Sequence, residues 1–231
     1  MAAQPPADMA EFGRVALLAD IHGNFLALEA MVAALRPRAP EAWCILGDTV
    51  GYFPAGREVL GLLKDLGGIC LLGNHEAMLG ADDWRNGEYY RLAEQKAELP
   101  VEQLEWLRSW PQKLSIRLGA ERALLVHGSP AEPLRGYVYP DGDLEKHRPE
   151  GHEMLFMGHT HRPFSRPVNG GGLCNVGSVG LPRDGSRCST AVLFDSGGRR
   201  LEFVRVAIDA ARLRKEYGRR THPAVFQRLE N

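Results

Sequence analysis

Seven side chains that can bind metal ions stand directly after short apolar runs of this sequence. They are Asp20, His22, Asp48, Asn74, His127, His159 and His161, in the motifs ADIHGN, LGDTVG, GNHE, VHGS and MGHTH. The set offers carboxylate, amide and imidazole ligands but no thiolate. It therefore favours Mn, Fe, Zn, Co or Ni and argues against a structural zinc site. The motifs predict two divalent metal ions, and Mn²⁺ is the ion that we expect.

A pair of such ions indicates hydrolysis of a phosphate ester. Two metals about 3.5–4 Å apart can hold a bridging hydroxide and polarise a phosphoryl oxygen for in-line displacement. The two oxygens of Asp48 suit it to bridging both ions. The leaving group also needs a proton, and His75, beside Asn74, can deliver it because histidine titrates near neutral pH. We expect Glu76, the next residue in GNHE, to orient the His75 ring.

Each of these residues taken alone has a simpler interpretation. A single Asp or His at the end of a strand is more often a turn or cap residue than a metal ligand. The joint pattern favours the metal site, because five of the eight histidines follow apolar runs beside glycine or asparagine. The other three, His147, His152 and His222, show no such placement, and we interpret them as exposed or structural.

Strands and helices alternate in the segment that carries the first three motifs. We predict strands at 14–19, 43–46 and 69–72 and helices at 25–35 and 57–66. Asn24 is the expected N-cap of the first helix. This order implies a parallel sheet with right-handed crossovers. Ligands gather beyond the carboxyl ends of such strands, which is where these three motifs begin.

Strands dominate the second half of the chain. The segment 84–110 is polar and helical, and we expect it to cover one side of the site. Further strands are predicted at 114–118, 123–126, 154–157, 173–176, 189–194 and 201–206, followed by a helix at 207–219. No linker or repeat divides the chain. We therefore expect one α/β domain with two sheets over residues 14–231, after a disordered lead-in over residues 1–13.

Composition excludes several other classes of protein. A formal net charge of −1 gives no overall attraction to nucleic acid or to an acidic membrane surface. No apolar run approaches the roughly 20 residues of a membrane span, and the N-terminus lacks the pattern of a signal peptide. The four cysteines include no C-x-x-C pair. We therefore expect free thiols and a location in the reducing cytoplasm.

The motifs D-x-H, G-D, G-N-H-E, H-G and G-H-T-H, in this order, resemble those of the calcineurin-like metallophosphoesterase superfamily. The resemblance runs from about Arg14 to Arg187. It implies a four-layer α/β/β/α sandwich of two mixed sheets with a dinuclear site between loops at one edge. It also implies one metal bound by Asp20, His22 and His161, a second bound by Asn74, His127 and His159, and Asp48 bridging both. His75 corresponds to the family's catalytic histidine.

Three longer stretches indicate a branch of that superfamily. ADIHGNFLALEAMV, GDTVGYFP and NVGSVGLPRDG resemble small bacterial and archaeal phosphoesterases related to diadenosine tetraphosphatase or to YfcE-type phosphodiesterases. The second motif lacks the Asp-Arg pair of G-D-x-x-D-R-G. That pair is typical of serine/threonine protein phosphatases and of symmetrical dinucleoside tetraphosphatases, so its absence argues against both.

The resemblance favours a metal-dependent phosphodiesterase that acts on a small phosphate ester or a nucleotide. From the composition we expect no nucleic-acid or membrane partner. A phosphomonoesterase and a dinucleoside polyphosphatase are alternatives within the same chemistry. A non-catalytic scaffold, as in the retromer subunit of this fold, is an alternative outside it. The presence of His75 and of every expected ligand argues against the scaffold.

Contacts with the substrate must come from residues outside the metal motifs. Arg183, in LPRDG, can approach a phosphate or can pair with Asp184. Arg135 and Tyr137, in PLRGYVYP, can overhang the site and stack on a base or aryl group, or can pack the loop that holds them. The sequence leaves these alternatives open.

Overall fold

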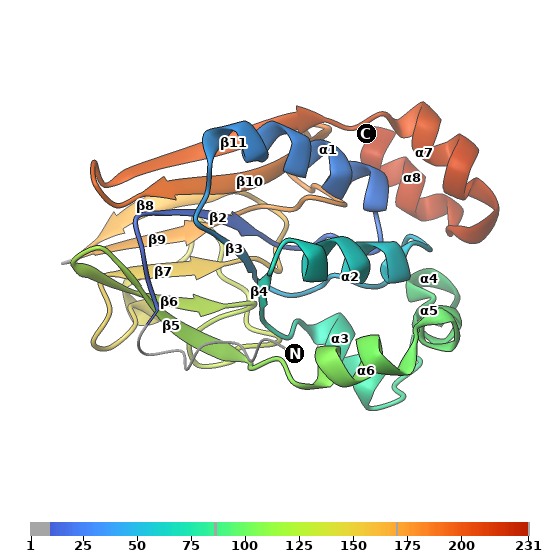
Figure 1. The fold of residues 1–231 in the computed structure, drawn as a ribbon, viewed down its shortest axis with the longest axis horizontal. Coiled ribbons are helices and arrows are strands. Elements are labelled where there is room, and N and C mark those ends of the chain that lie inside the picture. Colours follow the sequence, from blue (N-terminus) through green and yellow to red (C-terminus); the bar gives the residue numbers. More distant parts are fainter. Residues whose placement is uncertain (1–9, 86, 170, 231) are drawn as a thin grey trace.

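The strands form two mixed sheets that pack face to face (Figure 1). The computed structural model describes residues 10–85, 87–169 and 171–230. The five-stranded sheet has the order β11-β10-β2-β3-β4. Its strands are β2 (Arg14–Leu18), β3 (Ala42–Ile45), β4 (Ile69–Cys70), β10 (Cys188–Asp195) and β11 (Arg200–Ala207). The predicted parallel strands are β2, β3 and β4, and the antiparallel pair β10–β11 extends them at one edge.

Two helices connect the parallel strands, as the sequence predicts. They are α1 (Phe25–Leu35) and α2 (Gly56–Asp65). The side-chain oxygen of Asn24 accepts a hydrogen bond from the Ala27 amide at 3.2 Å and so caps α1. Leu28 and Met31 of α1 are fully buried in a cluster that includes residues of the five-stranded sheet. The two helices therefore form the outer layer over this sheet.

The six-stranded sheet has the order β1-β5-β6-β7-β9-β8. Its strands are β1 (Glu11–Phe12), β5 (Lys113–Leu118), β6 (Glu121–Val126), β7 (Met154–Met157), β8 (Phe164–Val168) and β9 (Gly171–Asn175). The sequence did not predict β8, which contains Pro167 and lies at an edge of the sheet, where proline is tolerated.

The start of the chain corrects one expectation. Residues 1–13 were expected to be a disordered lead-in, but Glu11–Phe12 form β1 and pair in parallel with Arg117 and Leu118 of β5. Residues 1–9 of the expected lead-in lie outside the described residues. The short strand contains too few residues for a periodic pattern, and its pairing partner lies over a hundred positions along the chain.

Alternation along β2 shows how the layers meet. Val15 and Leu17 belong to the core between the two sheets, together with Phe156 of β7. Ala16 and Leu18, on the opposite face, belong to the core beneath the helices. Since successive side chains of a strand point to opposite faces, a strand buried on both faces is apolar throughout.

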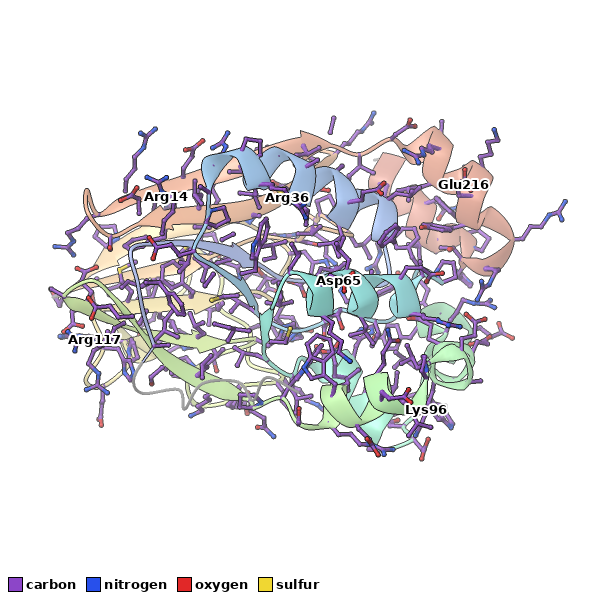
Figure 2. The ribbon with its side chains drawn as sticks, viewed as in Figure 1. Arg14, Arg36, Asp65, Lys96, Arg117 and Glu216 are labelled. Atoms are coloured by element: carbon purple, nitrogen blue, oxygen red, sulfur yellow. The ribbon has the colours of Figure 1, made fainter. Side chains whose placement is uncertain are left out.

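The layers follow the expected α/β/β/α order. The outer face of the six-stranded sheet is covered by the segment 128–153, which includes the 3-10 helix η3 (Glu145–His147). Val138 of this segment is buried in a cluster with Leu155 and Leu173 of that sheet. Long charged side chains such as Arg36, Asp65 and Glu216 are exposed (Figure 2). Among the residues that the structure describes, no helix combines the length and the apolar character that crossing a membrane would require.

Short helices gather at one end of the molecule (Figure 1). They are α3 (Asn74–Gly80), α4 (Gly87–Tyr90), α5 (Leu92–Glu98), α6 (Val101–Arg108), α7 (Ala210–Tyr217) and α8 (Pro223–Glu230). The predicted helix at 207–219 appears as α7, which starts later because β11 continues to Ala207 and Asp209 caps the helix. α8 was not predicted.

Candidate metal centre

Five of the seven predicted ligands adopt a backbone conformation that side chains rarely occupy. The φ angles are 52° for Asp20, 53° for His22, 54° for Asp48, 66° for His159 and 57° for His161. Residues other than glycine seldom adopt positive φ, and such conformations persist where the surrounding structure enforces them. Clustering of this strain at strand ends is typical of a functional site.

Hydrogen bonds between neighbouring loops hold these residues in place. The His22 amide donates to the Asp48 carbonyl at 2.9 Å, and the Asp20 amide donates to the Gly47 carbonyl at 3.1 Å. The Gly180 amide donates to the Asp20 carbonyl at 2.9 Å. The first ligand loop is therefore fixed on one side by the second and on the other by the loop after β9.

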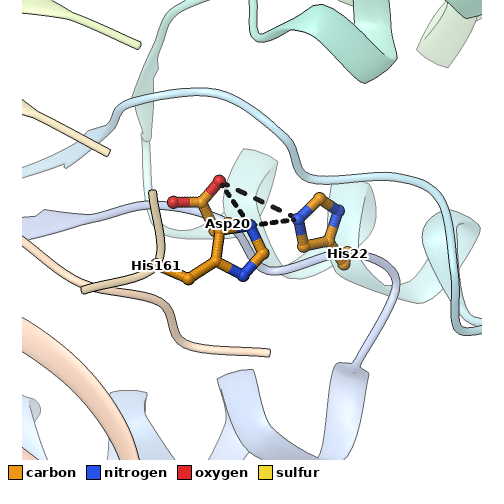
Figure 3. Close-up of side chains that lie close together, drawn as sticks. All are labelled: Asp20, His22 and His161. Atoms are coloured by element: carbon orange, nitrogen blue, oxygen red, sulfur yellow. Dashed lines mark hydrogen bonds and ion pairs between the residues drawn. The ribbon is translucent and has the colours of Figure 1, made fainter. Parts of the chain in front are cut away.

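One group of predicted ligands consists of Asp20, His22 and His161 (Figure 3). Asp20 Oδ1 lies 3.3 Å from His161 Nε2 and 3.8 Å from His22 Nε2, and the two nitrogens are 3.0 Å apart. All three residues are buried, with exposed fractions of 0 % for Asp20, 0 % for His22 and 2 % for His161. Asp20 Oδ1 has no hydrogen-bond partner among the described residues, so a buried acceptor points at the space between these three groups.

A second group consists of Asn74, His127 and His159. His127 Nε2 lies 3.1 Å from Asn74 Oδ1 and 3.0 Å from His159 Nδ1. His159 Nε2 is buried and has no hydrogen-bond partner among the described residues. Asn74 Oδ1, His127 Nε2 and His159 Nδ1 thus converge on a second point.

Asp48 lies between the two groups. Its Oδ2 is 3.8 Å from His22 Nε2 and 3.4 Å from His127 Nε2, while its Oδ1 accepts a hydrogen bond from the His75 amide at 2.9 Å. One carboxylate is therefore within reach of ligands from both groups, which is the position that a bridging residue requires.

Backbone carbonyls fix the orientation of three of the imidazoles. The Nδ1 atoms of His22, His127 and His161 face the carbonyls of Val50 at 3.3 Å, Leu46 at 2.8 Å and Leu181 at 2.5 Å. A neutral ring that donates Nδ1–H to a carbonyl keeps a lone pair on Nε2. In each of the three rings this lone pair points into the cluster, as metal ligation requires.

The pKa values of the clustered side chains show the effects of burial and of the Asp48 charge. Burial lowers the pKa of His159 to about 4 and lowers that of His22 well below its ordinary value. Burial alone would also lower the pKa of His127, but the Asp48 carboxylate raises it to about 9. The reciprocal attraction of His127 overcomes the effect of burial on Asp48 and holds its pKa well below the usual range. The lowered pKa values keep His22 and His159 neutral near pH 7, and neutral imidazoles beside the ionised Asp48 carboxylate are donors that fit borderline divalent cations.

His75 lies beside the ligands with its ring held by two tyrosines. Its Nε2 is 3.9 Å from Asp48 Oδ2, and its ring centroid is 5.1 Å from Tyr52 and 4.6 Å from Tyr90. Nδ1 is buried and lacks a hydrogen-bond partner among the described residues. Burial lowers the pKa of His75, and the Asp48 carboxylate partly opposes this.

Glu76 has a different role from the expected one. It does not hydrogen-bond to His75; its carboxylate accepts hydrogen bonds from the amides of Asp48, Thr49 and Gly73 at 2.6–2.8 Å. It also accepts from the Thr49 hydroxyl at 2.9 Å. Glu76 therefore fixes the backbone of the loop that carries Asp48.

Two of the three predicted substrate contacts lie at the site. Arg183 donates to the Tyr52 hydroxyl at 3.3 Å, and its buried Nε has no hydrogen-bond partner among the described residues. Asp184 pairs with Arg205 at 3.3 Å and not with Arg183. The Tyr137 ring lies 4.2 Å from the ring of His159.

These side chains, His75 and five of the predicted ligands line a cavity of about 170 Å³; the five are His22, Asp48, Asn74, His159 and His161. Arg135, the third predicted contact, is exposed and does not line it. The same cavity is lined by Tyr89, Tyr90 and Arg228, which sequence reasoning missed. The tyrosine pair lies in α4, within the segment 84–110 that was expected to cover one side of the site, but no pattern in that segment singled out these two residues. Arg228 lies in the unpredicted α8.

The class of protein follows from this fold and this site. Residues 14–197 match the family described as the calcineurin-like phosphoesterase superfamily domain. An uncharacterized protein of Methanocaldococcus jannaschii is 30 % identical over 218 residues, which cover 84 % of this chain and 88 % of that protein. The chain belongs to the calcineurin-like phosphoesterase superfamily.

Solved structures agree with this membership. A metallophosphoesterase from Sphaerobacter thermophilus superposes with a TM-score of 0.79 at 26 % identity, covering 94 % of this chain and 98 % of that one. A hypothetical protein from Pyrococcus horikoshii superposes with a TM-score of 0.82 at 26 % identity, covering 94 % and 97 %. The predicted superfamily and its fold are thereby confirmed.

Proposed function

We propose that this protein is a two-metal phosphodiesterase that hydrolyses a small phosphate ester. The observation that carries the proposal is the position of Asp48 between two buried groups of side chains, in the first of which Asp20 Oδ1 is an acceptor that has no hydrogen-bond partner among the described residues. Asp20, His22 and His161 would hold one ion, Asn74, His127 and His159 the other, and Asp48 would bridge them. Mn²⁺ is the ion we propose.

Bound ions would supply an activated water and polarise the phosphoryl group. The side chains and backbone of the protein would balance charge, orient the imidazoles and supply a proton. Asp48 and Asp20 compensate the positive charge, and the backbone carbonyls at Nδ1 keep the imidazoles in the ligating tautomer. His75 Nε2, which points toward Asp48, is the atom placed to donate a proton to the leaving group.

Aromatic surface at two points of the site favours a diester. Tyr52 and Tyr90 pack against His75, whereas Tyr137 packs against His159. Aromatic side chains would therefore lie on two sides of a phosphate held at the ions, one beside His75 and the other beside His159. A diester carries two organic groups and can use both, whereas a monoester carries one. Arg183, which has no carboxylate partner among the described residues, is placed to neutralise the phosphate.

Hydrolysis of bis-p-nitrophenyl phosphate tests this proposal. The purified protein with Mn²⁺ should release p-nitrophenol, chelation should abolish the activity, and added Mn²⁺ should restore it. The kcat/KM for this diester should exceed that for p-nitrophenyl phosphate. Hydrolysis that persists after the metal has been removed, or a preference for the monoester, would contradict the proposed chemistry or the proposed diester preference respectively.

A further inference from the structure

A second cavity opens beside the metal cavity. It has a volume of about 530 Å³ and is lined by Tyr89, His222, Ala224, Gln227 and Arg228. Tyr89 and Arg228 line both cavities. A substrate whose phosphate occupies the metal cavity could therefore extend past these two side chains into the larger space.

The second cavity offers hydrogen-bond donors and a positive charge. Arg228 lies over the Tyr89 ring at 5.4 Å, and no carboxylate pairs with its guanidinium among the described residues. His222 Nδ1 lies 3.3 Å from the Ala224 amide and accepts its hydrogen bond, so the neutral ring carries its proton on Nε2 and can donate. None of the described residues that line this cavity is acidic. The chemistry of the lining therefore suits an anion.

Packing fixes α8, which supplies Arg228 and Gln227. Val225, Phe226 and Leu229 of this helix are buried, and the Phe226 ring lies 6.0 Å from the ring of Phe53. Phe53 belongs to the same loop as Tyr52, so the helix is anchored on the loop that also contacts His75. A guanidinium on an anchored helix loses less freedom on binding than one on a mobile tail.

Tyr89 connects the two cavities through aromatic contacts. Its ring lies 5.1 Å from Tyr52 and 5.3 Å from His222, both in edge-to-face geometry. The guanidinium above it and the aromatic ring together form a surface on which a flat organic group can stack while an attached anion is neutralised. Residues 210–230, which include His222 and Arg228, lie beyond the 14–197 segment that matches the family.

We propose that the cavity over α8 is a second phosphate-binding subsite of the same active site. Its substrate is a phosphodiester in which one organic group carries a further, separate phosphate. Arg228 and His222 bind that phosphate, Tyr89 stacks on the organic group, and the diester lies in the metal cavity. This inference rests on the proposed function, because it places the scissile diester at the ligand cluster.

Two substrates that differ by one phosphate test the subsite. Thymidine 5′-(p-nitrophenyl phosphate) and its 3′-phosphorylated counterpart both release p-nitrophenol, and only the second carries the additional anion. The protein with Mn²⁺ should show at least a tenfold higher kcat/KM for the 3′-phosphorylated ester. Arg228→Gln, which keeps much of the aliphatic stem, should reduce this ratio about tenfold, the loss expected for one charge-assisted hydrogen bond. Arg219→Gln, an exposed arginine between α7 and α8 that lines neither cavity, should keep the ratio.

Calorimetric affinities separate the subsite from the hydrolytic chemistry. The protein with Mn²⁺ should bind thymidine 3′,5′-bisphosphate about tenfold more tightly than thymidine 5′-monophosphate, and Arg228→Gln should remove the difference. If neither ester is hydrolysed while this difference persists, the proposed function fails and the subsite stands. An equal ratio of affinities in the unmodified protein and in Arg228→Gln overturns the subsite, whether or not the esters are hydrolysed.

Discussion

At the scale of single residues, His75 and Glu76 are neighbours in the sequence with separate tasks. His75 contacts Tyr52 and Tyr90 through its ring and approaches Asp48 through Nε2. Glu76 turns toward backbone amides of the second ligand loop. The two side chains point in different directions because they are consecutive residues of α3, which starts at Asn74, and consecutive side chains of a helix lie about 100° apart around its axis. Substitutions of the two residues should therefore have different effects.

Replacing His75 should affect turnover while metal binding is retained. His75→Asn is expected to lower kcat about 10²–10⁴-fold for a diester with a poorly leaving alkyl group, which is the usual size of a general-acid contribution. The loss should be smaller for p-nitrophenolate, which leaves without a proton. Steady-state rates on the two substrates and metal content by mass spectrometry check this. Equal losses on both substrates would exclude a role for His75 as the proton donor.

Glu76→Gln should destabilise the protein and loosen the site. The Glu76 carboxylate has two oxygens that accept hydrogen bonds from backbone amides, whereas glutamine has only one. At least one buried amide therefore loses its partner. The expected cost is about 1–3 kcal/mol in the free energy of unfolding, accompanied by weaker metal binding because Asp48 lies in the same loop. Urea unfolding and a metal titration measure the two effects. A variant as stable as the original protein would show that these hydrogen bonds contribute little.

At the scale of elements, the loop between β3 and α2 determines the position of both Asp48 and His75. Gly51 in this loop has φ of +93°, and a Cβ built there would lie 2.2 Å from His75 Nδ1. Only glycine leaves room for the imidazole at this point. The loop therefore positions His75 by direct contact as well as through Asp48.

Gly51→Ala should displace the His75 ring and reduce kcat, whereas Gly67→Ala serves as its matched control. Gly67, at the end of α2, has φ of +64° but nothing within 4 Å of a built Cβ. Both variants carry the strain of positive φ, roughly 1–2 kcal/mol, and only Gly51→Ala adds the collision. We expect both to lose stability in thermal unfolding and only Gly51→Ala to lose turnover. Similar turnover in the two variants would show that a Cβ at position 51 does not displace the His75 ring.

The sequence predicted the elements whose patterns are local. The parallel strands β2, β3 and β4, the helices α1 and α2, and the Asn24 cap follow from apolar runs and cap residues within a few positions. The structure also brings together the seven predicted ligands. Elements that depend on distant partners were missed: β1 pairs with Arg117 and Leu118, and α8 is held by Phe53 and Leu181. The expected role of Glu76 was wrong because adjacency says nothing about direction on a helix.

At the scale of the whole molecule, the histidine cluster should make the stability of the metal-free protein depend on pH. The folded pKa of His159 is about 4, below its ordinary value of 6.5, so its contribution is present above pH 6.5 and is lost as the pH falls toward 4. The folded pKa of His127 is about 9, so its contribution is present below pH 6.5 and is lost as the pH rises toward 9.

Thermal unfolding of the chelator-treated protein between pH 4 and 9 should show both losses. In His127→Gln the loss on the alkaline side should shrink, because the group that releases its proton there is absent. In the metal-loaded protein the pH dependence of stability should change on both the acid and the alkaline side, since ligation requires the deprotonated imidazoles. An unchanged alkaline slope in His127→Gln would show that another group titrates there.

The central claim is that this fold assembles two metal sites around Asp48, and diffraction at the manganese absorption edge tests it most directly. Crystals grown with Mn²⁺ should show two anomalous peaks about 3.5–4 Å apart, with the Asp48 carboxylate between them. One peak should lie beside Asp20, His22 and His161 and the other beside Asn74, His127 and His159. Crystals of Asp48→Asn should lose at least one peak. A single peak in the original protein, or two peaks that Asp48 does not join, would contradict the account.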